Sequence, residues 1–149
     1  MEEAAALAAA GIPVAVVPGV TSAISVPAAV GIPVTHRGVA HEFTVVSGHL
    51  APDDPASLVD WRALAALHGT LVLLMAVERM GAIADTLIRH GRSPDTPAAV
   101  VQEGTTAAQR RVDATLGTVA ERIAAEEVRP PAVVVVGEVV RLGPAADPA

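Results

Sequence analysis

The segment VVPGVTSAISVPAAVGIPVTHR, residues 16–37, places a turn rich in hydroxyl groups directly after an apolar run. A buried strand over residues 13–17 would end at the Pro-Gly pair of this segment, because neither residue continues a strand readily. Thr21 or Ser22 is then a suitable N-cap for a short helix that continues to Ala29. The segment therefore predicts a strand, a turn and a helix in close succession, as in α/β folds.

The rest of the chain continues this alternation of short apolar strands with helices. Further strands are predicted at 43–47, 71–75, 97–102, 111–116 and 131–142, and helices at 4–10, 61–67, 79–90 and 119–127. The strands are almost continuously apolar, which indicates a sheet covered on both faces. The pattern predicts an α/β fold, a layered mixed sheet with flanking helices.

The composition excludes several classes of site and partner. The chain has no cysteine, so disulfides, thiolate nucleophiles and cysteine-ligated metal sites are ruled out. All 10 basic residues are arginines, which excludes a lysine Schiff base. The net charge is −6, and the only aromatic residues are one tryptophan and one phenylalanine. The chain therefore lacks the excess of basic side chains that neutralises phosphates and the aromatic side chains that stack on bases. No nucleic-acid partner is expected.

Length and hydropathy predict a soluble chain that is long enough for one compact domain. The mean hydropathy is +0.50, but no apolar run approaches the roughly 20 residues that a membrane-spanning helix needs. The amino-terminal sequence lacks the basic and apolar regions of a secretory signal. We therefore expect no membrane association and a cytoplasmic location.

Common catalytic and cofactor motifs are absent, since the sequence has no GxGxxG, P-loop, HExxH or GxSxG pattern. The 5 histidines show no metal-binding spacing, so no metal site is expected. Ser47-Gly48-His49 brings a hydroxyl near an imidazole in the sequence. At the end of a strand the two side chains need not meet, and a polar loop is the preferred interpretation.

Small or hydroxyl residues follow several of the predicted strands, at 18–22, at 75–76 and at 103–106. In open α/β sheets, ligands bind beyond the carboxyl ends of the strands, where backbone amides and small side chains approach them. The three turns could together hold a small molecule. The alternative is that they are ordinary turns between strands and helices.

Four segments resemble, in the same order, motifs of the uroporphyrinogen-III C-methyltransferases within the tetrapyrrole methylase family. Residues 16–37 resemble the family's P-G-[VI]-[TS]-[SA]-A segment and its G-I-P-[LV]-T-H-R element. The others are TLVLLMAVERM at 70–80, AAVVQEGTTAAQRRV at 98–112 and PPAVVVVGEVVRL at 130–142. The GIPVTHR element favours the uroporphyrinogen branch over other tetrapyrrole methylases.

The resemblance also implies how the chain is divided. Members of this family have two α/β domains, and the first carries a glycine-rich loop and a G-G-D-P-[FL] loop, neither of which is present here. Residues 1–37 resemble the end of that first domain and the inter-domain connection, 38–142 resemble the second domain, and 143–149 are expected to form a flexible tail. The acidic and basic catalytic residues of the family lie in the part without a counterpart, so the catalytic residues stay unknown.

The resemblance implies a set of ligand-contacting residues. Thr21, Ser22, Met75 and Gly104 match family positions that contact S-adenosylmethionine. Each has a structural alternative: a helix N-cap for the two hydroxyl residues, a core methionine at a strand end, and a turn glycine. Arg37 could pair with a carboxylate of uroporphyrinogen III, because arginine binds carboxylates in a bidentate manner. A surface arginine is an equally good interpretation of Arg37.

The implied function is transfer of methyl groups from S-adenosylmethionine to ring carbons of uroporphyrinogen III, which gives precorrin-2 on the route to sirohaem and cobalamin. The implied partners are this small tetrapyrrole and a second copy of the chain, as a homodimer, without a metal. The chain alone is expected to have weak activity or none, because half of the cofactor crevice would be missing. The alternatives are a non-catalytic module for dimerisation or cofactor binding, and a methylase of another tetrapyrrole intermediate.

Overall fold

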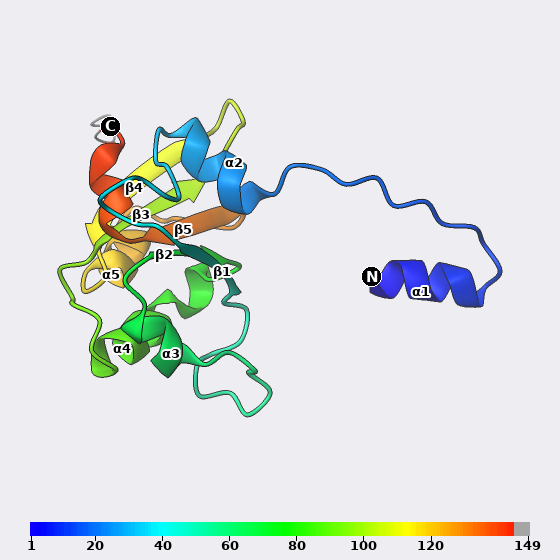
Figure 1. Ribbon diagram of the computed structural model, residues 1–149, viewed down its shortest axis with the longest axis horizontal. Helices are drawn as coiled ribbons and strands as arrows, with labels where there is room; N and C mark the ends of the chain where they lie inside the picture. The colour runs from blue at the N-terminus through cyan, green and yellow to red at the C-terminus, as the bar shows by residue number, and fades with distance from the viewer. Residues whose placement is uncertain (145–149) are drawn as a thin grey trace.

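The computed structural model describes residues 1–144 and contains a five-stranded mixed sheet (Figure 1). The strands are β1 (Phe43–Ser47), β2 (Thr70–Leu74), β3 (Pro97–Gln102), β4 (Arg110–Thr115) and β5 (Ala132–Val136), in the order β1-β2-β5-β3-β4. β1 and β2 are parallel, β5 is antiparallel to both β2 and β3, and β4 is antiparallel to β3. β1, β2 and β3 therefore point in one direction, and their carboxyl ends lie at one edge of the sheet.

β5 is the central strand, and its valines alternate between the two faces of the sheet. Val134 and Val136 pack into the largest hydrophobic cluster, whereas Val133 and Val135 pack on the opposite face. All of these valines are at most 5% exposed. A strand that is buried on both faces needs apolar residues at every position, which explains the run of consecutive valines in the sequence.

One face of the sheet is covered by α3 (Trp61–Ala66), α4 (Met80–Arg89) and α5 (Val119–Ala125). Ile83 and Leu87 lie one turn apart on α4 and belong to the same cluster as Leu71 and Leu73 of β2. All four side chains are fully buried. This face, called the α4 face below, carries the main hydrophobic core.

The opposite face, called the α2 face below, is covered by α2 (Ser22–Ala29) and the 3₁₀ helix η2 (Glu138–Leu142) (Figure 1). Its clusters are smaller: one joins Ala23 and Val26 of α2 to the sheet, and the other joins Val139 and Val140 of η2 to it. The result is a three-layer arrangement of helices, mixed sheet and helices. It confirms the fold class predicted from the sequence.

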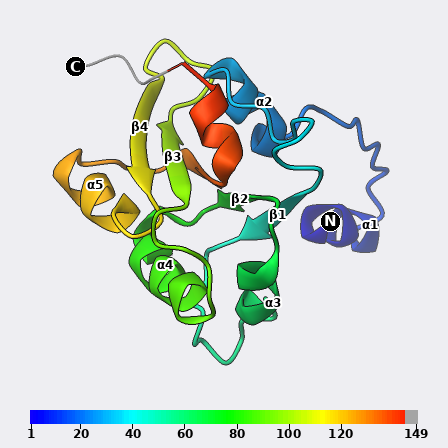
Figure 2. The same cartoon turned by 60° about the vertical axis from the view of Figure 1, so that its left-hand side comes forward.

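An amino-terminal arm, residues 1–20, extends away from this three-layer body (Figure 1 and Figure 2). It consists of α1 (Glu2–Ala9), which has no buried residue, and an extended segment in which Val16, Val17 and Val20 are between 70% and 88% exposed. The strand predicted at 13–17 is not formed. The physical reason is that no strand of the described chain lies beside this segment to share backbone hydrogen bonds with it.

The other predicted elements are present, and the largest change of boundary is at the last strand. It was predicted over 131–142, but β5 ends at Val136. Gly137 turns the chain there with φ 153°, and a Cβ at this position would lie 3.3 Å from Cα of Thr70. Glycine therefore allows a close turn beside β2, after which the chain continues as η2.

The segment after η2 packs against the body as far as it is described. A Cβ on Gly143 would lie 3.0 Å from Cγ1 of Ile32, and one on Gly31 would lie 2.7 Å from Cδ of Pro144. The first two residues of the tail predicted over 143–149 thus lie against Gly31 and Ile32, and the flexibility of the tail stays a prediction. Residues 145–149 lie outside the described part of the chain.

Candidate functional site

A cavity of about 670 Å³ lies at the carboxyl edge of the sheet, on the α2 face. It is bounded by the ends of β2 and β3, the start of β5, helix α2, the 3₁₀ turn η1 (Val77–Arg79) and the turn after β3. Small-molecule sites usually have volumes of about 300–1,000 Å³. The cavity therefore has both the size and the position expected for a ligand site in an α/β sheet.

The structure brings together three of the residues predicted to contact a cofactor. Ser22 at the start of α2, Met75 directly after β2 and Gly104 in the turn after β3 all line this cavity. Thr21 precedes Ser22 as the N-cap of α2, and its Oγ1 accepts a hydrogen bond from the amide of Ala23 at 3.3 Å. Thr21 is therefore a helix N-cap, the structural role given above as its alternative. Cofactor contact by Thr21, Ser22, Met75 and Gly104 stays a prediction.

Gly104 lets the turn after β3 approach α2 closely. A Cβ at this position would lie 2.5 Å from Cγ1 and 2.7 Å from Cγ2 of Val26. The turn is fixed by a hydrogen bond that the amide of Thr105 donates to Oε1 of Gln109 at 2.7 Å. Any residue larger than glycine would push α2 away from the turn and change the shape of the cavity.

Three residues at the rim of the cavity have unusual backbone conformations. Met75, Glu103 and Thr105 have φ values of 56°, 50° and 70°. Positive φ is uncommon for residues other than glycine and occurs preferentially at functional sites. Glu103 is held by two backbone hydrogen bonds, because its amide donates to the carbonyl of Pro131 at 3.0 Å and its carbonyl accepts from the amide of Thr106 at 3.1 Å. The side chain of Met75 is 63% exposed and borders the cavity.

Ionisable side chains that the sequence interpretation did not assign to a site also line the cavity: His49, Glu78, Arg79 and Glu103. Nδ1 of His49 lies 3.0 Å from Oγ of Ser47, so these two side chains meet in an exposed contact, which the sequence did not require. The signal that could have identified all four is their position, since each follows the end of β1, β2 or β3 within five residues.

Arg37 lies apart from this cavity. It is exposed, in the turn closed by the β-bridge between His36 and Ala40. Arg79 is the arginine that lines the cavity. A role of Arg37 in substrate binding stays a prediction, and Arg79 is the better placed residue for pairing with a ligand carboxylate.

A second, smaller hollow of about 420 Å³ lies beside the turn that contains Arg37, and His41, Glu42 and His68 are among its lining residues. Nε2 of His41 accepts a hydrogen bond from the amide of Gly38 at 3.3 Å. Among residues 1–144, no group of three or more histidine, cysteine or acidic side chains is arranged to hold a metal ion. The same part of the chain contains no helix with the length and apolar character to cross a membrane.

Comparison with protein families decides what kind of chain this is. The model of the Tetrapyrrole (Corrin/Porphyrin) Methylases matches residues 1–120. The chain belongs to the tetrapyrrole methylase family. This confirms the family predicted from the four sequence segments.

Three proteins show which tetrapyrrole methylases the chain is similar to. It is 48% identical over 141 residues to the S-adenosyl-L-methionine-dependent uroporphyrinogen III methyltransferase of Methanosarcina barkeri, covering 95% of this chain and 55% of the relative. It is 50% identical to the siroheme synthase of Stutzerimonas stutzeri, covering 95% of this chain and 30% of the relative. It also matches the crystal structure of uroporphyrin-III C-methyl transferase from Thermus thermophilus complexed with S-adenyl homocysteine, with 47% identity and a TM-score of 0.75, covering 94% of this chain and 59% of that one.

The alignments cover a larger share of this chain than of the three tetrapyrrole methylases. The alignments take in nearly all of this chain, but the chain spans only 30–59% of the length of the three proteins. The fold described here therefore corresponds to part of each of them.

Proposed function

We propose that this chain takes part in the S-adenosylmethionine-dependent C-methylation of uroporphyrinogen III to precorrin-2, for sirohaem and cobalamin biosynthesis. The observation that carries the proposal is that Ser22, Met75 and Gly104, which match cofactor-contacting positions of the family, line one cavity. Identities of 47–50% to two uroporphyrinogen methyltransferases and a siroheme synthase support the choice of substrate.

The chemistry of the cavity fits S-adenosylmethionine. The exposed thioether of Met75 is a soft, polarisable neighbour for an adenosyl or sulfonium group. Gly104 has no side chain, so a ligand can approach the backbone of its turn. The amino terminus of α2 at Ser22 carries the positive end of the helix dipole, which favours the carboxylate of the ligand's amino-acid portion. Glu78 and Glu103 offer acceptors for its ammonium and hydroxyl groups.

When bound, S-adenosylmethionine supplies an electrophilic methyl group on its sulfonium. The contribution of this chain is to hold the two reactants in a fixed relative orientation, which can account for a large part of such a rate enhancement. Val26, Leu74 and Val133 give the cavity apolar walls. Arg79 supplies a guanidinium that can pair with a carboxylate of the tetrapyrrole.

We further propose that residues 1–37 are the end of a first domain and the inter-domain connection, and that 38–142 are a second domain. The exposed apolar side chains of the arm, among them Val16, Val17 and Val20, are suited to packing against that first domain. α2, the later part of the connection, packs on the sheet of the second domain and lines the cavity. The cavity would then form one wall of a complete crevice, and residues 1–149 alone would have weak activity or none.

A non-catalytic role in dimerisation or cofactor binding is the second candidate. It is favoured by the coverage of only 55% of the M. barkeri relative, which leaves room for groups outside this chain to carry out the catalytic step. A methylase of another tetrapyrrole intermediate is a further alternative, distinguished from the first proposal by its substrate.

The test is a fusion protein. The part of the M. barkeri relative that lies outside the aligned region is joined to the amino terminus of residues 1–149. Methyl transfer from S-adenosylmethionine is then followed by mass spectrometry with a panel of tetrapyrroles. We expect methylation of uroporphyrinogen III by the fusion and little or none by the chain alone. Gly104→Val should abolish activity of the fusion by pushing α2 away and changing the shape of the cavity, whereas Gly81→Ala on α4, where the added Cβ would lie 3.7 Å from Cβ of Ala120, should not.

Three results would contradict these proposals in different ways. A folded fusion that methylates another tetrapyrrole in preference would contradict the substrate. A fusion that binds S-adenosylmethionine but methylates nothing would favour the non-catalytic role. Full activity of the 149-residue chain alone would contradict the proposed division into domains.

Assembly and location follow from the same resemblance. We infer a homodimer that acts in the cytoplasm on a small tetrapyrrole. Light scattering of the fusion protein during size-exclusion chromatography should give the mass of a dimer, and a monomer mass over a range of concentrations would contradict this inference.

A further inference from the structure

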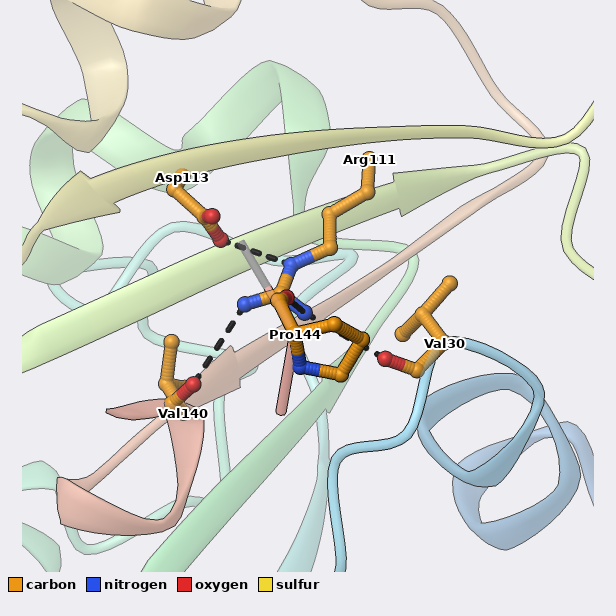
Figure 3. A network of polar contacts seen from close by, with 5 residues as sticks. All are labelled: Val30, Arg111, Asp113, Val140 and Pro144. Carbon is orange, nitrogen blue, oxygen red and sulfur yellow. Dashed lines mark hydrogen bonds and ion pairs between the residues drawn. The ribbon is translucent and has the colours of Figure 1, made fainter. Parts of the chain in front are cut away.

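The side chain of Arg111 lies among Val30, Val140 and Pro144 on the α2 face of the sheet (Figure 3). Arg111 belongs to the edge strand β4, and its side chain is 8% exposed. Nε donates to Oδ1 of Asp113 at 2.8 Å. The two terminal nitrogens donate to carbonyl oxygens of Val30 and Val140, each at 3.3 Å, and of Pro144. One guanidinium therefore joins the end of α2, η2 and the segment after η2 to the sheet.

The backbone around Arg111 is shaped for this close approach. A Cβ on Gly143 would lie 2.9 Å from Nη1 of Arg111, and one on Gly31 would lie 2.7 Å from Cδ of Pro144. Gly31 also has φ 73°, which glycine adopts without strain. The carbonyls can thus converge on one planar group whose N–H donors point in several directions. Lysine, a single ammonium, would not reproduce this fork.

α2 has few other attachments to the sheet. Within residues 1–144, the bond from Arg111 to Val30 is the one hydrogen bond that joins α2 or its caps to a strand. The apolar contacts of α2 come from short side chains such as Ala23 and Val26. Because a short helix moves as a rigid unit, fixing its end at Val30 also fixes Ser22 at the other end, where α2 lines the cavity.

We propose that Arg111 is a positioning residue for the cavity. By fixing the carboxyl end of α2, it holds Ser22 and Val26 in the wall against which the ligand packs. Arg111 is not among the residues that line the cavity, so its effect on the ligand passes through α2. The part of this proposal that concerns S-adenosylmethionine rests on the function proposed above.

The experiment compares Arg111→Met and Arg111→Lys with the wild-type chain. Arg122→Met is the matched control, because it removes a surface guanidinium of α5 that is paired with Glu126, the C-cap of that helix. Amide hydrogen exchange is measured over the whole chain, and the dissociation constant for S-adenosylhomocysteine is measured by calorimetry. In Arg111→Met we expect the amides of Val30 and Ile32 to exchange roughly tenfold faster. The reason is that loss of a hydrogen bond from a charged donor lowers the free energy of local opening.

The centres of β2 and β5 should keep their protection in Arg111→Met, and affinity for S-adenosylhomocysteine should fall about threefold to tenfold. Arg111→Lys should restore part of both losses because it keeps the charge, and Arg122→Met should change neither. If Arg111→Met does not fold, Arg111→Lys gives the same two measurements with smaller changes.

Two outcomes would overturn the proposal. In the first, exchange of α2 amides is unchanged in Arg111→Met. In the second, exchange rises equally in α2, β2 and β5, which is the result of a merely structural role. If the wild-type chain binds no S-adenosylhomocysteine, its affinity is measured in the fusion protein described above, and a fusion that binds none contradicts the proposed cofactor. The exchange data still decide whether Arg111 holds α2.

Discussion

The two faces of the sheet are stabilised in different ways. The α4 face buries one large hydrophobic cluster with side chains from every strand. The α2 face has two smaller clusters, and Arg111 joins its outer elements to the sheet through carbonyl oxygens. The cavity lies on this second face. The comparison indicates that the α4 face supplies most of the stability, while the α2 face is free to serve binding.

The largest effect is expected in the core of the α4 face. Leu73 is fully buried in the large cluster, and Leu73→Ala should lower the free energy of unfolding by about 3 kcal/mol. Urea denaturation followed by circular dichroism measures this change. Leu58 is 99% exposed, so Leu58→Ala is a matched control and should cost less than about 0.5 kcal/mol. Similar losses in the two variants would contradict the assignment of the core.

Arg92 extends the comparison to a buried arginine on the other face. It is 7% exposed, and burial of the guanidinium lowers the pKa of Arg92 from its ordinary value. Its terminal nitrogens donate, at 2.9–3.5 Å, to the carbonyl oxygens of Leu64, Leu67, Gly69 and Val136. Arg92→Met should lower the free energy of unfolding by about 2 kcal/mol, because these buried acceptors lose their donor.

The exposed Arg62 on the neighbouring helix α3 provides the control for Arg92, since Arg62→Met should leave the urea midpoint almost unchanged. Hydrogen exchange distinguishes the two buried arginines. Arg92→Met should reduce protection across the whole sheet, whereas Arg111→Met should reduce it mainly in α2. The same exchange pattern in both variants would remove the distinction between the faces.

Gly104→Ala tests the contact between the turn after β3 and α2. Because the added Cβ would lie 2.5 Å from Cγ1 of Val26, α2 must shift, and we expect a loss of about 1.5 kcal/mol in stability. Affinity for S-adenosylhomocysteine should fall as well. Gly19→Ala, with no neighbour within 4 Å of the added atom, controls for the change of residue type. Unchanged stability and affinity in Gly104→Ala would show that the turn and α2 are not closely packed.

The smallest effect is expected at Thr70, whose side chain points to the α2 face. It is 1% exposed, and among the described residues its Oγ1 has no hydrogen-bond partner. Thr70→Val replaces this hydroxyl with a methyl group of similar size and should raise the free energy of unfolding by up to about 1 kcal/mol. A clear loss in the urea midpoint would instead indicate that the hydroxyl is satisfied in solution.

Local pattern was sufficient to predict the elements of the body. The apolar runs of β2, β3 and β5 and the cap at Thr21 are signals contained in a few neighbouring residues. The strand at 13–17 could not be predicted correctly in the same way, because a strand also needs a neighbour. The end of β5 was missed since the apolar pattern continues through Val139 and Val140, and only the contact of Gly137 with Thr70 reveals the turn.

For the site, the sequence predicted the positions of some residues but not the directions of their side chains. Residues that directly follow strands, such as Met75 and Gly104, could be placed at one edge of the sheet from topology alone. The direction of Glu78 and Arg79 depends on the positive φ of Met75 and on the turn η1, which the pattern does not specify. The contacts of Arg111 join segments up to 81 residues apart, so no local motif indicates them.

The central claim, that the cavity on the α2 face binds the adenosyl cofactor, can be tested on methionine methyl groups. The chain has 3 methionines: Met1 on the arm, Met75 at the cavity and Met80, which is 1% exposed in the core of the α4 face. Titration of methyl-¹³C-methionine-labelled chain with S-adenosylhomocysteine, with Met75→Leu to assign the signal, should shift the Met75 resonance in a saturable way and leave Met1 unchanged. An unshifted Met75 signal at the solubility limit of the ligand, with the protein folded, would contradict the account.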